Sequence, residues 1–188
     1  MTERKKKIEM EKSEELSNKI SLFWNQNKDE ITDRSFYSVA KKALTKEEYE
    51  SCFLSDYFSE KVDELAIEGD DYFEKREYEA AIEAYKKGIE IIPEPKNLWE
   101  TKLWFTAAIA DSYWNLKKYK NALEYLDDSL QVEGGKENAF IRLRRGQVLF
   151  ELQRIIEAKQ ELQKGYELNG EDLFEDEDDK YLKLIKER

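Results

Sequence analysis

The residues of this chain that could do chemistry are carboxylates and aromatic rings, and these types favour binding over catalysis. Of its 188 residues 43 are Asp or Glu and 13% are aromatic, while there is no histidine and one cysteine, Cys52. That composition removes the commonest general base, the Ser-His and Cys-His nucleophile pairs, and any site built from several thiolates. We therefore predict that the protein is not an enzyme and holds no cofactor or metal.

Two short motifs resemble ligand sites but lack the spacing that those sites need. The segment Gly134-Gly135-Lys136 lacks the spacing of a phosphate-binding loop, and we expect it to end a helix. The acidic run 171–179 lacks the alternation of a calcium-binding EF-hand loop. Acids that precede a helix favour the positive end of its dipole, so we expect part of this run to cap the helix that follows.

Three stretches of the chain carry one spaced pattern, and the copies lie about 40 residues apart, which is typical of stacked helix pairs. Each copy combines small and bulky residues at the spacing of two helix faces. The shared positions are a small residue (Gly69, Ala110, Gly146), a large one (Tyr72, Tyr113, Leu149) and an alanine (Ala81, Ala122, Ala158).

This pattern resembles the tetratricopeptide repeat family, whose unit has about 34 residues with Trp, Gly, Tyr, Ala and Pro at set places. Pro93 falls where the family has its proline, and Gly134 and Gly170 stand there in the second and third copies. The family's tryptophan is replaced, copy by copy, by Leu65, Thr106 and Arg142. The resemblance covers about residues 61–170 and implies an all-α, right-handed solenoid of three helix pairs.

The resulting division of the chain has three parts. Residues 1–58 are expected to form an N-terminal helical cap, with about the first ten residues frayed. Residues 59–170 hold the three repeats, at 59–95, 97–134 and 136–170. Residues 171–188 combine the acidic run with a capping helix at 178–186. The expected helix pairs are 60–75 with 78–92, 97–116 with 119–132, and 136–152 with 155–168.

Within the N-terminal cap, apolar residues at helical spacing predict two or three short helices. One stripe comprises Leu16, Ile20 and Phe23. A second stripe comprises Phe36, Val39, Ala40 and Ala43. Thr45 and Glu48 then have the spacing of a capping box, which predicts a third helix at 46–54.

Charge is unevenly distributed along the chain, which carries a net charge of −11. Acidic and basic residues balance within residues 1–50, so the whole acidic excess lies in the repeats and the tail. This excess argues against nucleic-acid binding and favours a basic partner. The lone cysteine, the lack of an apolar stretch long enough for a membrane helix and the lack of a secretory signal predict a cytoplasmic protein.

In the family, the first helix of each pair lines the concave groove, and the repeat alignment assigns residues to that surface. Its acidic and aromatic side chains would suit a basic, partly apolar segment. The predicted partner-binding residues are Asp63, Asp70, Phe73, Glu74, Trp104, Asp111, Trp114, Asn115, Phe140, Arg144, Gln147, Phe150 and Glu151. Alternatively, Trp104 and Trp114 belong to the core, Asp70 and Asp111 form a solvated face, or Trp99 and Trp104 pack on N-terminal helices that fill the groove.

One branch of the family grips acidic chaperone tails with Lys, Asn, Asn, Lys and Arg at five set positions. The matching positions here are Ala66, Asp70, Ala108, Phe140 and Arg144. Only the arginine remains, and Asp70 would repel a carboxylate. The sequence therefore predicts no binding of such tails.

The function predicted from these features is a protein-interaction module with a basic or apolar partner. Two narrower hypotheses stay open. One is an immunity protein, or antitoxin, that neutralises a basic toxin such as a nuclease, because the chain resembles small bacterial repeat proteins in which a segment like 168–183 follows the last repeat. The other is a chaperone for a secreted substrate. The sequence does not decide among these roles or the oligomeric state.

Overall fold

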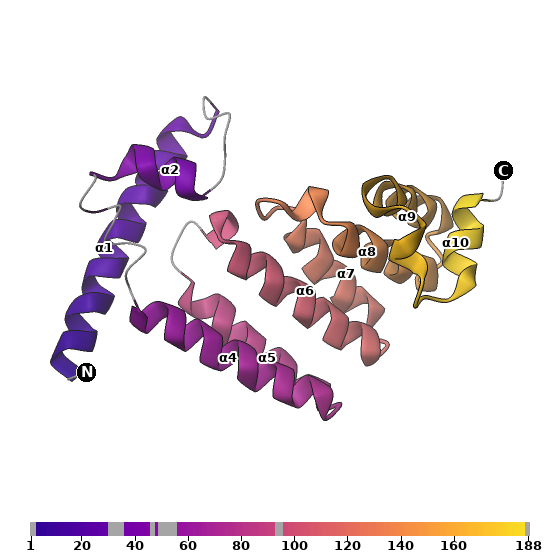
Figure 1. Cartoon of the computed structure of the whole chain (residues 1–188), viewed down its shortest axis with the longest axis horizontal. Helices are drawn as coiled ribbons and strands as arrows, with labels where there is room; N and C mark the ends of the chain where they lie inside the picture. The colour runs from indigo at the N-terminus through magenta and orange to yellow at the C-terminus, as the bar shows by residue number, and fades with distance from the viewer. Residues whose placement is uncertain (1–2, 30–35, 46–47, 49–55, 93–95, 187–188) are drawn as a thin grey trace.

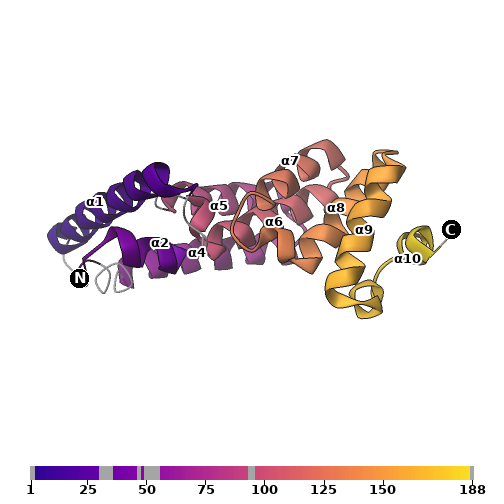
Figure 2. The same ribbon diagram turned by 90° about the horizontal axis from the view of Figure 1, so that it is seen from above.

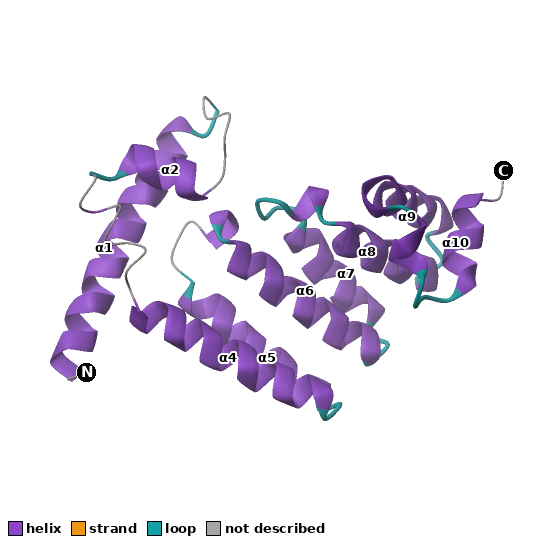
Figure 3. Cartoon of the chain, in the orientation of Figure 1, coloured by secondary structure: helices purple, strands orange, loops and turns teal. Residues whose placement is uncertain are grey.

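All regular elements within the described residues are helices (Figure 3). The computed structural model describes residues 3–29, 36–45, 48, 56–92 and 96–186. The α-helices are α1 (Glu3–Asn27), α2 (Phe36–Ala43), α4 (Asp56–Glu74), α5 (Tyr78–Ile91), α6 (Glu100–Asn115), α7 (Tyr119–Ser129), α8 (Ala139–Glu151), α9 (Ile155–Asn169) and α10 (Asp179–Lys186). The 3-10 turns are η1 (Lys96–Leu98), η2 (Gly135–Glu137) and η3 (Glu171–Phe174).

Three antiparallel helix pairs, α4–α5, α6–α7 and α8–α9, stack side by side into an array (Figures 1 and 2). This arrangement confirms the predicted all-α repeat solenoid. The expected helices agree with the observed ones to within a few residues. The largest difference is the start of α4, which lies four residues before the expected one; α6 and α8 each begin three residues late, after a 3-10 turn. At α8, the Asn138 side chain accepts a hydrogen bond from the Ile141 amide (3.1 Å) and so fixes the N-terminus.

Each helix pair is joined by the same tight turn. A non-glycine residue adopts the left-handed conformation in each, with φ of 62° at Arg76, 55° at Lys117 and 61° at Gln153. In every turn two backbone amides donate hydrogen bonds to carbonyls of the preceding helix. In the third turn these bonds run from Gln153 N to Phe150 O and from Arg154 N to Leu149 O (both 2.9 Å). These bonds satisfy carbonyls that a helix end leaves free. The three turns therefore show that the third copy is a structural repeat like the other two.

The small residue near the middle of each first helix is required by close packing on the second helix. A Cβ at Gly69 would lie 2.1 Å from the Tyr85 ring, and one at Gly146 would lie 2.6 Å from the Leu162 side chain. Ala110 occupies the same place in the second pair and is fully buried. The spaced pattern in the sequence thus reflects a repeated helix crossing.

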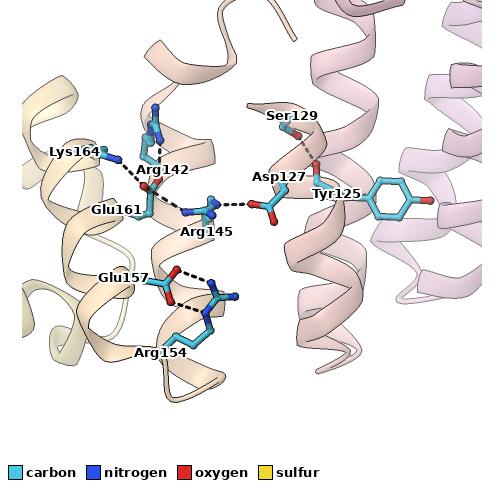
Figure 4. Close-up of polar contacts among 9 residues, drawn as sticks. All are labelled: Tyr125, Asp127, Ser129, Arg142, Arg145, Arg154, Glu157, Glu161 and Lys164. Carbon is cyan, nitrogen blue, oxygen red and sulfur yellow. Dashed lines mark hydrogen bonds and ion pairs between the residues drawn. The ribbon is translucent and has the colours of Figure 1, made fainter. Parts of the chain in front are cut away.

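A polar cluster lies within the third pair and ties it to the second (Figure 4). Glu161 is buried and accepts hydrogen bonds from Arg142 Nη1 (2.7 Å) and Lys164 Nζ (2.8 Å). Arg145 Nη1 lies 3.4 Å from the same carboxylate, and Arg145 Nε donates to Asp127 of α7 (2.8 Å). Arg142 stands where the family has tryptophan, so a buried ion pair replaces a ring there.

The N-terminal helices pack on each other at one end of the array (Figure 1). Their small core contains Leu16, Ile20, Val39, Ala40 and Leu44, in agreement with the two apolar stripes. The expected fraying of the first ten residues is wrong, because α1 is helical from Glu3. Its run of Glu, Lys and Met consists of strong helix formers.

The predicted capping box is present at the end of this region. The Thr45 amide donates to Glu48 Oε2 (3.0 Å), and the Glu48 amide donates to Thr45 Oγ1 (3.2 Å). The helix expected at 46–54 lies outside the described residues, apart from Glu48. Trp99 packs against both the N-terminal core and the core of the first repeats, so it links the cap to the array.

The C-terminal helix covers the last repeat, as the sequence predicted. Tyr181 of α10 is buried in one cluster with Leu143 and Leu162. The acidic run before it includes η3, whose Phe174 is buried in the same cluster. Asp178 Oδ1 accepts a hydrogen bond from the Lys180 amide (3.0 Å), so part of the run caps α10 as expected.

Candidate functional site

A groove of about 360 Å³ lies along the first two repeats and the start of α8. Helices α4 and α6 provide most of its lining, Tyr85 comes from α5, and Asn138 and Phe140 lie at the N-terminus of α8. Five of the predicted partner-binding residues line this groove: Asp70, Phe73, Trp104, Asp111 and Phe140. The other lining residues are Tyr85, Glu100, Leu103, Ala107, Ala108 and Asn138, and the N-terminal helices contribute none of the described lining.

Two aromatic side chains of the groove are exposed, which is unusual for residues of their size. Trp104 is 42% exposed and Phe140 is 37% exposed. Trp104 is nonetheless fixed from behind, because its ring meets Tyr85 edge-on (5.6 Å, 87°) and Phe105 edge-on (5.2 Å, 73°). A rigid, exposed ring of this kind provides contact area at a small entropic cost.

The groove is acidic. Asp70 Oδ1 accepts a hydrogen bond from the Tyr85 hydroxyl (2.8 Å), and burial together with this carboxylate raises the pKa of Tyr85. Burial raises the pKa of Asp111, and nearby Glu177 adds to that rise while the charge of Arg144 opposes it. With Glu100, three carboxylates and no lysine or arginine are found among the lining residues.

Arg144 lies outside the groove lining and contacts two lining residues, Asp111 and Phe140. Its Nε lies 2.8 Å from Asp111 Oδ1 in an ion pair, although neither atom is aligned for a hydrogen bond. Its Nη1 donates to Gln147 Oε1 (2.7 Å). Its Cζ lies 5.0 Å from the Trp114 ring centroid and 5.4 Å from that of Phe140. With its side chain only 11% exposed, Arg144 is neutralised and stacked.

At the third repeat, the predicted partner-binding residues contact the C-terminal segment instead of open groove. Gln147 is fully buried and donates to Glu177 Oε2 (2.7 Å). Phe150 meets the Tyr181 ring edge-on at 5.5 Å. Glu151 accepts hydrogen bonds from Lys180 Nζ (2.9 Å) and the Tyr181 hydroxyl (3.1 Å). The groove therefore extends over the first two repeats and ends at the start of α8.

The remaining predicted residues lie outside the groove lining. Asp63 and Glu74 are exposed on α4, and Trp114 is half-buried beneath Arg144. Asn115 is exposed and donates to the Asp111 carbonyl (2.9 Å).

Six lining residues were not among those predicted to bind a partner, and two of them bear on the charge of the groove. Glu100 is one, and it could have been predicted because it lies one helical turn before Trp104, on the same face of α6. Tyr85 is the other, because its repeat position assigned it only to the core. Its ring is indeed buried, yet its hydroxyl reaches the groove carboxylate Asp70.

Comparison with known protein families gives a match in the first two helix pairs. The sequence profile of the tetratricopeptide repeat family matches residues 69–95 and 107–134, which fall in the first two helix pairs. The chain therefore carries tetratricopeptide repeats in these two stretches. No curated protein matches it in sequence. The profile does not match the α8–α9 pair. This pair nevertheless has the same left-handed turn, at Gln153, and a small residue, Gly146, at the same place as the two pairs before it.

Solved structures of other tetratricopeptide repeat domains share this fold. The first such domain of Spaghetti (RPAP3), bound to the HSP90 peptide SRMEEVD, is 25% identical, with a TM-score of 0.55 over 68% of this chain and 93% of that one. The Arabidopsis OM64 domain is 15% identical, with a TM-score of 0.55 over 69% and 94%. The Sgt2 domain from Aspergillus fumigatus is 21% identical, with a TM-score of 0.52 over 66% and 74%.

Two further properties bear on the kind of ligand. No group of three or more Cys, Asp or Glu side chains among the described residues is arranged to hold a metal ion. In the part of the chain that the structure covers, no helix combines the length and the apolar character needed to cross a membrane.

Proposed function

We propose that this tetratricopeptide repeat protein is a non-catalytic interaction module that binds a basic, partly apolar segment of another protein in its groove. The observation that carries the proposal is the lining itself, in which exposed rings adjoin carboxylates without a basic residue. Rings supply contact area and attract cations, and carboxylates pair with Lys or Arg.

Similarity to a peptide-bound domain supports a peptide as the class of ligand. The Spaghetti (RPAP3) domain, a quarter identical in sequence, holds a heptapeptide. That peptide is acidic, and the groove of this chain is acidic too. Asp70 would repel the carboxylates of such a peptide, and Arg144, which could attract them, is already paired with Asp111. Electrostatics therefore favours a ligand of opposite charge to SRMEEVD.

The two narrower roles, an immunity protein for a basic toxin and a chaperone for a secreted substrate, would use the same surface. Neutralisation of a basic toxin implies charge-steered association, which slows steeply as salt rises. A chaperone that grips apolar segments implies a weak salt dependence. The salt dependence of the association rate with a purified partner would therefore distinguish these hypotheses.

A peptide-display library of random sequence, panned on the full chain, tests the proposal across all peptide chemistries at once. We expect enrichment of peptides that combine Lys or Arg with apolar side chains. Binding of the enriched peptides should fall at least about fivefold in Trp104→Ala, because an exposed ring contact at an interface is worth about 1 kcal/mol or more. The variant Asp70→Asn, which keeps an oxygen that accepts from Tyr85, should also bind less tightly.

The matched control is Asp71→Asn, which removes the same charge from the neighbouring, exposed position of α4. It should leave binding unchanged, because a step of one residue turns the side chain about 100° around the helix. Enrichment of acidic peptides, or equal losses in Asp71→Asn and Asp70→Asn, would contradict a groove that selects basic segments. Isothermal titration with SRMEEVD should show no binding, and micromolar affinity would refute the charge argument directly.

A further inference from the structure

Two cations of the chain itself contact aromatic rings on the first helices of the second and third repeats. Phe73, Trp114 and Phe150 occupy equivalent positions on the first helix of each repeat. The guanidinium of Arg144 lies over the Trp114 ring, at 5.0 Å from its centroid, and the Lys180 ammonium lies 5.4 Å from the centroid of Phe150. Two of three equivalent rings are thus each covered by one cation from elsewhere in the chain, an arrangement that favours cation–π attraction.

Two components of the Lys180 site come from α8, and a third, the Tyr181 ring 4.8 Å from Lys180 Nζ, comes from α10 itself. Besides the Phe150 ring, Glu151 directly after it accepts a hydrogen bond from Lys180 Nζ at 2.9 Å. This hydrogen bond raises the pKa of Lys180, so the cation is strongly held in its charged form. The neighbouring Tyr181 adds an edge-on contact with Phe150 at 5.5 Å. A ring followed by a carboxylate is therefore a working site for a lysine side chain in this protein.

The first repeat has the same two components at the equivalent place. Phe73 lines the groove and Glu74 follows it, with Asp70 one turn earlier on the same helix face. Phe73 is held edge-on by Tyr78 (5.3 Å, 70°), and Glu74 is exposed. Across the described residues, no cation of the chain lies over Phe73 or pairs with Glu74. The adjacent Lys75 and Arg76 belong to the turn and are exposed there.

We infer that Phe73, Glu74 and Asp70 form a subsite for one lysine or arginine side chain of the partner, equivalent to the place that Lys180 takes in the third repeat. This inference rests on the proposed function, because it names the contact that recognises the basic part of the segment. The ring receives the cation on its face, and Glu74 receives its N–H groups. Asp70 lies beside them, and its hydrogen-bond partner, the Tyr85 hydroxyl, carries no charge that would offset the carboxylate.

A small probe tests the subsite on the full chain. The acetylated dipeptide amide Ac-Lys-Tyr-NH2 copies the pair Lys180-Tyr181 and is titrated into 15N-labelled protein at millimolar concentration. We expect shifts of backbone amide signals centred on residues 70–74. The same dipeptide with an Nε-acetylated lysine has no charge and should leave these signals in place, since acetylation removes the cation.

Variants give the second readout, with the dissociation constant of the dipeptide as the measured quantity. Glu74→Gln and Phe73→Leu should each weaken binding about two- to fivefold, as expected for a single exposed ion pair or cation–π contact. Glu74 is exposed, so its replacement leaves the fold intact even if Phe73→Leu does not. Asp71→Asn is again the matched control and should bind normally.

Three results would overturn the inference: equal shifts with the acetylated probe, no shifts at residues 70–74 with the charged probe, or unchanged affinity in Glu74→Gln. Failure of this inference can be distinguished from failure of the proposed function. Library peptides that lose affinity in Trp104→Ala but not in Glu74→Gln would keep the groove as the binding surface and reject the subsite.

Discussion

Glu161 is the residue whose replacement most sharply tests how the array is held together. Its carboxylate is only 6% exposed and faces Arg142, Arg145 and Lys164 (Figure 4). Removing one partner of a buried ion pair costs about 3–5 kcal/mol, because the other charge stays buried without compensation. Arg142 keeps its bond to the Lys136 carbonyl (2.9 Å). We therefore expect Glu161→Ala to lower the free energy of unfolding by about 3 kcal/mol, at the low end of that range.

The effect has a defined pH dependence. Burial alone would raise the pKa of Glu161, but hydrogen bonds from Lys164 and Arg142 and the charge of Arg145 outweigh it and lower the pKa below its ordinary value of 4.5. The folded carboxyl then binds its proton less readily than the unfolded one. Its contribution is therefore present above pH 4.5 and is lost as the pH falls through the folded pKa. The stability difference between wild type and Glu161→Gln should shrink over that window.

Urea denaturation followed by helical circular dichroism measures both effects. The matched control is Glu157→Ala, one turn earlier on α9, where the carboxylate is 47% exposed and pairs with Arg154 at 2.5 Å. Exposed pairs contribute little because water screens them, so this variant should unfold like wild type. Equal stability of Glu161→Ala and Glu157→Ala, or a Glu161 effect that persists unchanged at about pH 3, would refute the role given to the buried cluster.

Three further substitutions test the packing, the turns and the groove. Gly69→Ala places a methyl group against the Tyr85 ring and should cost about 1–3 kcal/mol in urea denaturation; a neutral result would contradict the close helix crossing. Gln153→Gly relieves a left-handed φ of 61° and should raise the free energy of unfolding by about 0.5–1 kcal/mol, whereas a loss of stability would argue against strain in the turn. Asp111→Asn removes the anion paired with Arg144, so isothermal titration should detect binding of SRMEEVD that the wild type lacks; an absence of binding in this variant too would show that the stacked guanidinium is inaccessible.

The repeat architecture could be predicted from sequence because each of its causes is local. Small residues such as Gly69 and Gly146 mark the helix crossings, and short polar links mark the turns. The capping box at Thr45 and Glu48 is a four-residue signal and forms as expected. At the N-terminus the first ten residues were expected to fray, whereas α1 is helical from Glu3, as the helix propensity of its residues favours.

The groove was only partly predictable, because repeat alignment assigns the face of each helix but not what covers it. Alignment correctly grouped Asp70, Phe73, Trp104, Asp111 and Phe140 on one surface. It treated the third repeat as equally open. The residues that cover that repeat come from the C-terminal segment, 30 positions after the residues they contact, and no periodic signal in the sequence connects the two.

Occupation of the third repeat makes the groove asymmetric in charge. Glu151 is neutralised by Lys180, and Asp111 is offset by Arg144. Among the described residues, Asp70 is bound by a neutral hydroxyl and Glu100 pairs with no cation, so the groove carboxylates without a cation lie on α4 and at the start of α6. If the cation of a bound segment occupies the subsite at the first repeat, the segment lies in one direction, with its apolar side chains over Trp104 and Phe140. A paramagnetic label placed at one end and then at the other end of a library-selected peptide would establish this polarity, and equal broadening from both positions would contradict it.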